Sequence, residues 1–332
     1  GLSTRSLGTG AHSEGGATIA SGDYSHAEGD PTTASGYASH AEGVLTLASG
    51  YSSHSEGITT LAGATGSHSE NILTQALGVG SHCEGIYYND VYVALYGEGG
   101  FEIGIPGNTA YNVALGIGSH VEGAGNTGYG DYTHTEGVFC YAGIIGGGGT
   151  GAHVEGIGSY SIGEGSHAEG IVTFATGKGA HAEGFGGEYS DSSNQGATGD
   201  YSHTEGESSS ALGFASHAEG HSFAIGAYSH SENHGYAAGY DSHAENGGNA
   251  NGVASHAEGF ASAAVGEMTH AEGLSTKANN TAAHAEGYFT IADAQYTHAE
   301  GFVSYAFGIG SHAEGYNAFN NASSGPIKKA AN

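Results

Sequence analysis

The sequence predicts an all-β fold, a parallel β-solenoid (β-roll) built from coils of about 14 residues. Three observations predict it: the motif Ser-His-Ala-Glu-Gly at 25–29 recurs with small substitutions, a second small-residue patch such as Ala34-Ser35-Gly36 precedes the next copy, and side-chain types alternate within both. Self-similarity at a short fixed period is typical of solenoids. Alternation is the signature of strands, so each repeat should hold two short strands, centred on Ala-x-Gly and on Ser-x-Ala-x-Gly.

The motif occurs twenty times, each histidine has a glutamate two residues later, and the commonest step between copies is fourteen residues. The histidines are His12, His26, His40, His54, His68, His82, His120, His134, His153, His167, His181, His203, His217, His230, His243, His256, His270, His284, His298 and His312. Since successive strand side chains point to opposite faces, the small motif residues should share one face and His and Glu the other.

The regular spacing of the motif is interrupted at three places within a predicted repeat domain of residues 1–315. We interpret them as insertions at 86–118, 138–152 and 185–201, and expect the first to form a hairpin. Insertions in solenoids map to loops, often on a binding face. Residues 316–332 lack the motif and are interpreted as an exit or neck segment.

Composition excludes several classes of partner. The formal net charge is -29 with only 5 Lys plus Arg, so no basic stripe could follow a phosphate backbone and we expect no nucleic-acid partner. No apolar run approaches membrane-spanning length, so we expect no membrane insertion. Two cysteines, Cys83 and Cys140, do not make a disulfide framework.

The predicted coil interior holds mainly Ala, Ser and Gly, which bury little apolar area. Burial at about 25 cal/mol per Å² cannot offset backbone ordering of about 1 kcal/mol or more per residue with methyl groups alone. A lone solenoid would therefore be marginally stable. A closed cyclic oligomer is the simplest way to bury a further face.

The repeat resembles the head domain of YadA-like trimeric autotransporter adhesins. In residues 25–29 the Ser, Ala and Gly fit the small positions of that family, whereas His and Glu replace its Val and Ile, and residues 112–116 come closest to the family form. The resemblance covers roughly residues 6–315, and the His-Glu variant is similar to modules of phage tail fibres and prophage tail proteins. It implies a left-handed parallel β-roll and a homotrimer, intertwined or side by side.

In that family the Val and Ile positions face the trimer interior, which would place His and Glu between three chains. Buried charges need partners, so alternating charges or neutral hydrogen-bonded pairs are required. The expected interior ladder is represented by His26, Glu28, His40, Glu42, His54, Glu56, His167, Glu169, His217, Glu219, His256, Glu258, His312 and Glu314.

Repeated His-x-Glu pairs could also ligate metal ions, because imidazole and carboxylate both bind divalent ions. A motif present in every repeat marks architecture more often than a site, so we favour a structural ladder and expect no metal and no cofactor, with axial ions as the alternative. Half of a zinc-deaminase signature is present, but its Pro-Cys-x-x-Cys half is absent. Asp90, Glu98 and Glu188 could pair as catalytic acids, but solvated loop acids are the simpler interpretation, and we expect no enzyme activity.

Tyrosine supplies contact area with a polar tip, and several tyrosines cluster in or beside the first insertion. The alternative is that they pack the base of the hairpin. The receptor-binding candidates are Tyr87, Tyr88, Tyr92, Tyr96, Phe101, Tyr111 and Tyr189.

Together these features predict an extracellular or virion-surface, trimeric and fibrous attachment protein that presents loops to a host-surface glycan or protein. Three copies of a weak site on one fibre would raise avidity. The main alternative is a purely structural filament or spacer without its own receptor site. An ice-binding or metal-sequestering solenoid would need a regular Thr face or exposed His, and the Thr residues are scattered.

Overall fold

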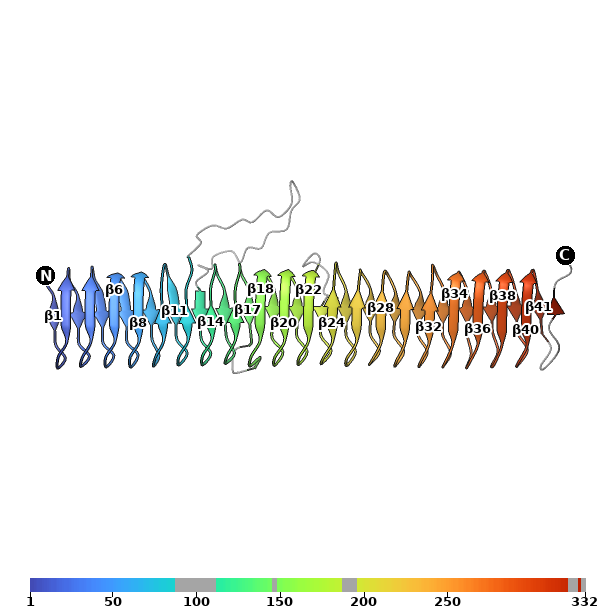
Figure 1. Cartoon of the computed structure of the whole chain (residues 1–332), viewed down its shortest axis with the longest axis horizontal. Coiled ribbons are helices and arrows are strands. Elements are labelled where there is room, and N and C mark those ends of the chain that lie inside the picture. Colours follow the sequence, from blue (N-terminus) through green and yellow to red (C-terminus); the bar gives the residue numbers. More distant parts are fainter. Residues whose placement is uncertain (87–111, 145–147, 187–195, 322–327, 330–332) are drawn as a thin grey trace, which may run out of the picture. The chain divides into compact units, whose positions relative to one another are not determined.

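The computed structural model describes residues 1–86, 112–144, 148–186, 196–321 and 328–329, and in these residues all regular structure is β (Figure 1). The prediction of an all-β parallel solenoid is confirmed: there are about 20 coils of about 14 residues per turn. The chain divides into two compact units, Gly1–Gly179 and Ala180–Asn332. Left-handed winding and trimerisation stay predictions.

Each coil contributes one strand to each of two sheets, so even-numbered strands build one sheet, here called the motif sheet, and odd-numbered strands the opposite sheet. In unit 1 the motif-sheet strands are β2 (His12–Gly15), β4 (His26–Gly29), β6 (His40–Val44), β8 (His54–Ile58), β10 (His68–Ser69), β12 (His82–Cys83), β14 (His120–Val121), β16 (His134–Thr135), β18 (His153–Ile157) and β20 (His167–Ile171). Its opposite-sheet strands are β1 (Arg5–Ser6), β3 (Ile19–Ala20), β5 (Thr32–Ala34), β7 (Thr46–Ala48), β9 (Leu61–Ala62), β11 (Thr74–Ala76), β13 (Asn112–Ala114), β15 (Thr127–Gly128), β17 (Tyr141–Ala142), β19 (Tyr160–Ser161) and β21 (Phe174–Ala175).

Unit 2 repeats this plan. Its motif-sheet strands are β22 (His181–Phe185), β24 (His203–Glu205), β26 (His217–Glu219), β28 (His230–Glu232), β30 (His243–Glu245), β32 (His256–Glu258), β34 (His270–Leu274), β36 (His284–Tyr288), β38 (His298–Phe302), β40 (His312–Tyr316) and β42 (Lys328–Lys329). Its opposite-sheet strands are β23 (Gly196–Ala197), β25 (Ser210–Ala211), β27 (Phe223–Ala224), β29 (Tyr236–Ala237), β31 (Asn249–Ala250), β33 (Ala263–Ala264), β35 (Lys277–Ala278), β37 (Ile291–Ala292), β39 (Tyr305–Ala306) and β41 (Phe319–Asn320).

Neighbouring coils pair in parallel and in exact repeat register. His26 of β4 lies opposite His40 of β6, and Ala34 of β5 lies opposite Ala48 of β7. Every motif residue therefore stacks on its own counterpart. A column of identical side chains along the stack follows directly from the repeat.

The coil interior is filled by small side chains. Ala27 and Ala34 are fully buried, one from each sheet, and Ser25 and Thr32 are buried beside them. The Ser25 hydroxyl donates to the Gly22 carbonyl at 2.6 Å, so a corner carbonyl inside the coil is satisfied without water. Large apolar residues cannot enter so narrow a coil, and most of them lie outside.

Two corner positions with left-handed backbone differ in the room that they leave for a side chain. Two residues before the motif histidine, Tyr24 and Ala38 adopt φ of 58° and 52°, so this corner tolerates a side chain. Gly29, which ends the motif, has φ of 116°, and a Cβ there would overlap the carbonyl oxygen of Gly43 in the next coil. The glycine of the motif is thus fixed by the contact between coils.

The coils resume inside all three predicted insertions. Strands β13, β17 and β23 belong to the opposite sheet, so residues 112–118, 138–142 and 196–201 contribute to coils. The remaining parts of the insertions include 87–111, 145–147 and 187–195, which lie outside the described residues. In the segment 316–332, strand β42 pairs with β40 and extends the motif sheet by one strand.

Candidate functional site

The candidate site is the outer face of the motif sheet, where histidines and glutamates form two parallel columns, here called the His–Glu ladder. In unit 1 the imidazole rings from His26 to His167 stack with centroids 4.5–4.9 Å apart and planes within 12°. In unit 2 the rings from His181 to His312 stack at 4.5–4.9 Å, within 24°. The strand spacing sets this separation.

Most rings lie close to the carboxylate of their own motif. The Nε2–Oε2 distance is 3.7 Å in the pairs His26–Glu28 and His40–Glu42, and 3.4 Å in His298–Glu300. Most of these distances exceed that of a good hydrogen bond. The side chains are about one-third exposed, so the ladder is half-buried in a single chain.

Most of the Nε2 atoms are buried and, among the described residues, have no hydrogen-bond partner. This holds in the motifs of His26, His40, His54, His68, His82, His120, His134, His153, His203, His217, His230, His243, His256, His270, His284, His298 and His312. A buried polar nitrogen without a partner is costly, and here the arrangement repeats coil after coil.

The carboxylates interact along their own column. Hydrogen bonding with Glu56, then burial, then hydrogen bonding with Glu28 raise the pKa of Glu42 to about 7. The pKa of Glu28 is lowered, chiefly by its hydrogen bond with Glu42. The pKa of Glu56 is lowered as well, by hydrogen bonds with Glu70 and Glu42. In this part of unit 1 a carboxyl with a raised pKa therefore lies between two carboxyls with a lowered pKa, because neighbouring carboxyls that share hydrogen bonds titrate as a coupled group.

Ten ladder histidines have a lowered pKa, which favours their neutral form. Burial lowers the pKa of His40, and the neighbouring rings of His54 and His26 lower it further. Burial is also the leading cause of the lowered pKa of His54, His68, His120, His153, His217, His243, His256, His284 and His298. Neutral imidazole is the form that can offer a nitrogen lone pair to a ligand.

An exposed apolar column runs beside the ladder, at the position four residues after the motif histidine. In unit 1 Val44 and Ile58 are 43% and 47% exposed and lie opposite each other in register. In unit 2 the rings of Tyr288, Phe302 and Tyr316 stack with centroids 4.8 and 5.1 Å apart. The motif face therefore combines the polar His–Glu ladder with this apolar column. The apolar column was not predicted from the sequence.

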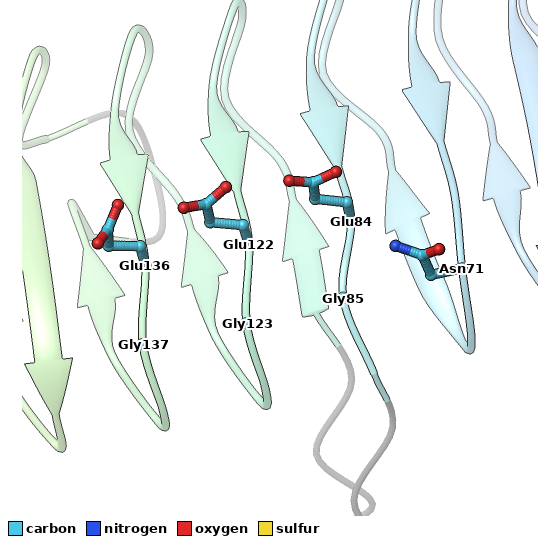
Figure 2. A pocket seen from close by; sticks show the side chains of 7 residues that line it. All are labelled: Asn71, Glu84, Gly85, Glu122, Gly123, Glu136 and Gly137. Atoms are coloured by element: carbon cyan, nitrogen blue, oxygen red, sulfur yellow. The ribbon is translucent and has the colours of Figure 1, made fainter.

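A shallow acidic groove of about 320 Å³ lies beside the first insertion in unit 1. Figure 2 shows the carboxylates of Glu84, Glu122 and Glu136 in a row, one from each coil. Asn71, which stands where the motif has Gly, lies at one end of this row. The groove is a continuation of the carboxylate column.

The receptor-binding candidates Tyr87, Tyr88, Tyr92, Tyr96, Phe101, Tyr111 and Tyr189 lie outside the described residues, as do Asp90, Glu98 and Glu188. All the predicted ladder residues lie within the described residues, on the outer face of the motif sheet. Whether this face lies inside a trimer stays a prediction.

No known family model and no curated protein matches the chain. Within the described parts of the chain there is no helix long and apolar enough to cross a membrane.

Proposed function

We propose that this chain is a module of a trimeric fibrous attachment protein that presents its insertions to a glycan or protein on a host surface. The observation that carries the proposal is the distribution of apolar side chains in the described residues: Ala, Ser and Thr fill most of the coils, whereas Tyr, Phe, Ile and Leu lie outside. Apolar surface left outside so regularly is typical of an interaction face. A second and third copy of the chain are the simplest partners for it.

The motif face is the best candidate for the surface between chains. Val44, Ile58, Ile72 and Ile86 are 38–48% exposed and follow one another on successive coils beside the ladder. Contact between copies along this column would bury apolar area worth about 25 cal/mol per Å². It would also remove the partly exposed ladder from water, as the resemblance to trimeric heads implies.

A mass measurement tests the trimer. Sedimentation or light scattering of the chain should give three times the monomer mass of 33.0 kDa. Ile58→Lys places a charge in the apolar column and should shift the chain toward monomer. Leu47→Lys is the matched control, because Leu47 is exposed on the opposite sheet and should leave the trimer intact. A monomeric parent chain, or equal behaviour of the two variants, contradicts the proposal.

Attachment itself is tested on the first insertion. Replacing Tyr92 and Tyr96 by Ser should weaken binding to glycan arrays or to cells without changing the mass of the assembly. Avidity makes such a loss steep, because three copies of the site are weakened together. Unchanged binding would favour the alternative function, a structural filament or spacer. The in-register stacking of the coils also fits that alternative, since it supports a spacer without any receptor site.

A further inference from the structure

In the His–Glu ladder, many buried Nε2 atoms have no hydrogen-bond partner among the described residues. In the stretch from β4 to β12 each of these nitrogens is buried, and the nearest carboxylate oxygen is 3.4–4.0 Å away. Buried polar groups are normally satisfied, and exceptions call for a group that completes them. A metal cation placed between the two groups would take both the nitrogen lone pair and the carboxylate oxygen as ligands.

The separations suit such a cation. With about 2.0–2.1 Å from zinc to nitrogen and about 2.0–2.2 Å from zinc to oxygen, two ligand atoms of a tetrahedral site lie about 3.4 Å apart. His82 Nε2 is 3.4 Å from Glu70 Oε1 of the preceding coil and 4.0 Å from Glu84 Oε2 of its own. Small side-chain movements would bring all three atoms onto one ion.

Related groups, each with two histidines and one glutamate from adjacent coils, recur in both units. One ligand atom from each of His54, Glu56 and His68 lies within 4.8 Å of the others in unit 1. His217, Glu219 and His230 form an equivalent group in unit 2. Since the repeat register generates these groups, the capacity for cations belongs to the coil stack rather than to one special site.

We propose that the His–Glu ladder binds divalent transition-metal ions of the Zn²⁺ class. Each ion is held by histidine Nε2 atoms and carboxylate oxygens of two adjacent coils, and water completes the coordination. Imidazole selects Zn²⁺, Ni²⁺ or Co²⁺ over Mg²⁺ and Ca²⁺, which prefer all-oxygen sites. The inference concerns a single chain and holds whichever oligomer the chain forms.

The ladder cannot be filled at every coil. Ions on adjacent coils would be only about 4.8 Å apart, the strand spacing, and would repel each other strongly. We therefore expect occupation of about every second motif. With twenty motifs in the sequence, this gives about ten ions per chain.

The test uses the full chain, stripped with EDTA and titrated with Zn²⁺, with bound metal measured by mass spectrometry after gel filtration. About ten Zn²⁺ should remain bound per chain, at least tenfold more tightly than Ca²⁺. Titration with Co²⁺ should give the intense visible absorption of tetrahedral cobalt.

The variant replaces by Gln the six histidines of the unbroken run, which removes six of twenty motifs and should lower the zinc content by about three ions. These histidines are His12, His26, His40, His54, His68 and His82. The matched control is His221→Gln with His234→Gln, the two histidines outside the motif, and it should lose none. Circular dichroism confirms that each variant keeps its β-structure.

Three results would overturn the proposal. The first is a zinc content of one ion or fewer per chain, and the second is Ca²⁺ binding as tight as Zn²⁺ binding, which would indicate carboxylates alone. The third is an equal loss of zinc in the six-histidine variant and in the control.

Discussion

Replacing the motif glycine Gly29 by alanine tests the contact on which the stack depends. Gly29 has φ of 116°, and an added Cβ would overlap the Gly43 carbonyl oxygen and lie 2.9 Å from the Gly43 carbonyl carbon. That oxygen accepts a hydrogen bond of 2.9 Å from the Asp30 amide. The methyl group can be admitted only if the two coils separate.

The cost has two parts. A non-glycine residue at this φ carries about 1–3 kcal/mol of backbone strain. Moving the Gly43 carbonyl away from the exposed Asp30 amide breaks a partly exposed hydrogen bond, at about 0.5–1.5 kcal/mol. The free energy of unfolding of these coils should therefore fall by about 1.5–4.5 kcal/mol in total.

Gly66→Ala is the matched control in the same unit. Gly66 also has a positive φ, 65°, but no atom lies within 4 Å of its added Cβ. The equivalent corner residue of an earlier coil is Ala38, at φ of 52°. Strain there is largely offset by the lower entropy of the unfolded chain, so the expected cost is about 1 kcal/mol or less.

Amide hydrogen exchange is the appropriate assay, because in a repeat protein stability is local and one unfolding midpoint averages over many coils. Gly29→Ala should speed exchange in β4 and β6 by a factor of about 10 or more. Gly66→Ala should leave exchange in β8 and β10 within about fivefold of the parent. If both variants exchange alike, close approach between coils is not what selects the motif glycine.

Three further predictions concern the coil interior and the ladder. Asn126→Ala removes the acceptor of the Cys140 amide and the donor to the Glu122 and Gly137 carbonyls, so it should cost about 2–5 kcal/mol in urea unfolding, whereas Asn126→Thr should cost less. Burial raises the pKa of Cys83 to about 12 and that of Cys140 to about 11, so a thiol reagent should label neither at pH 8 until the chain unfolds. In EDTA, the melting temperature should fall from pH 7.5 to pH 5.5: ten ladder histidines, among them His40, His54 and His68, have a lower pKa folded than unfolded, so the unfolded chain takes up their protons first. Glu42, whose pKa is raised to about 7, acts in the opposite sense, but ten histidines have a lowered pKa and their effect should prevail. A rise in melting temperature over this pH range would contradict the neutral state of these histidines.

The fold could be predicted from the sequence because the repeat itself encodes the register. Once His26 and His40 stand one coil apart, parallel pairing brings every motif residue onto its counterpart. The strand boundaries were less predictable. The opposite-sheet strand Thr32–Ala34 ends at the first residue of the small-residue patch Ala34-Ser35-Gly36 and is not centred on it. Gly36 belongs to the corner and not to the strand.

The site was only partly predictable. The columns of His and Glu follow from spacing alone, but the burial of Nε2 does not, because it depends on how rings 4.8 Å apart shield each other. The apolar column had a visible signal that was not used: Val44, Ile58, Ile72 and Ile86 each follow a motif by the same number of residues. The candidate receptor residues lie in segments without repeats, where periodicity carries no information.

We assign two functions to the motif face, association between chains and cation binding. Different residues of each strand should serve them. His and Glu occupy the first and third positions of the strand His54–Ile58, and the exposed aliphatic residue occupies the fifth. Association between chains should depend on the fifth position, and cation binding on the first and third. Ile58→Lys should therefore change the mass of the assembly while the zinc content per chain stays within one ion of the parent. A joint loss of trimer and zinc would mean that cations bind between chains, and that the ladder of one chain is only part of each site.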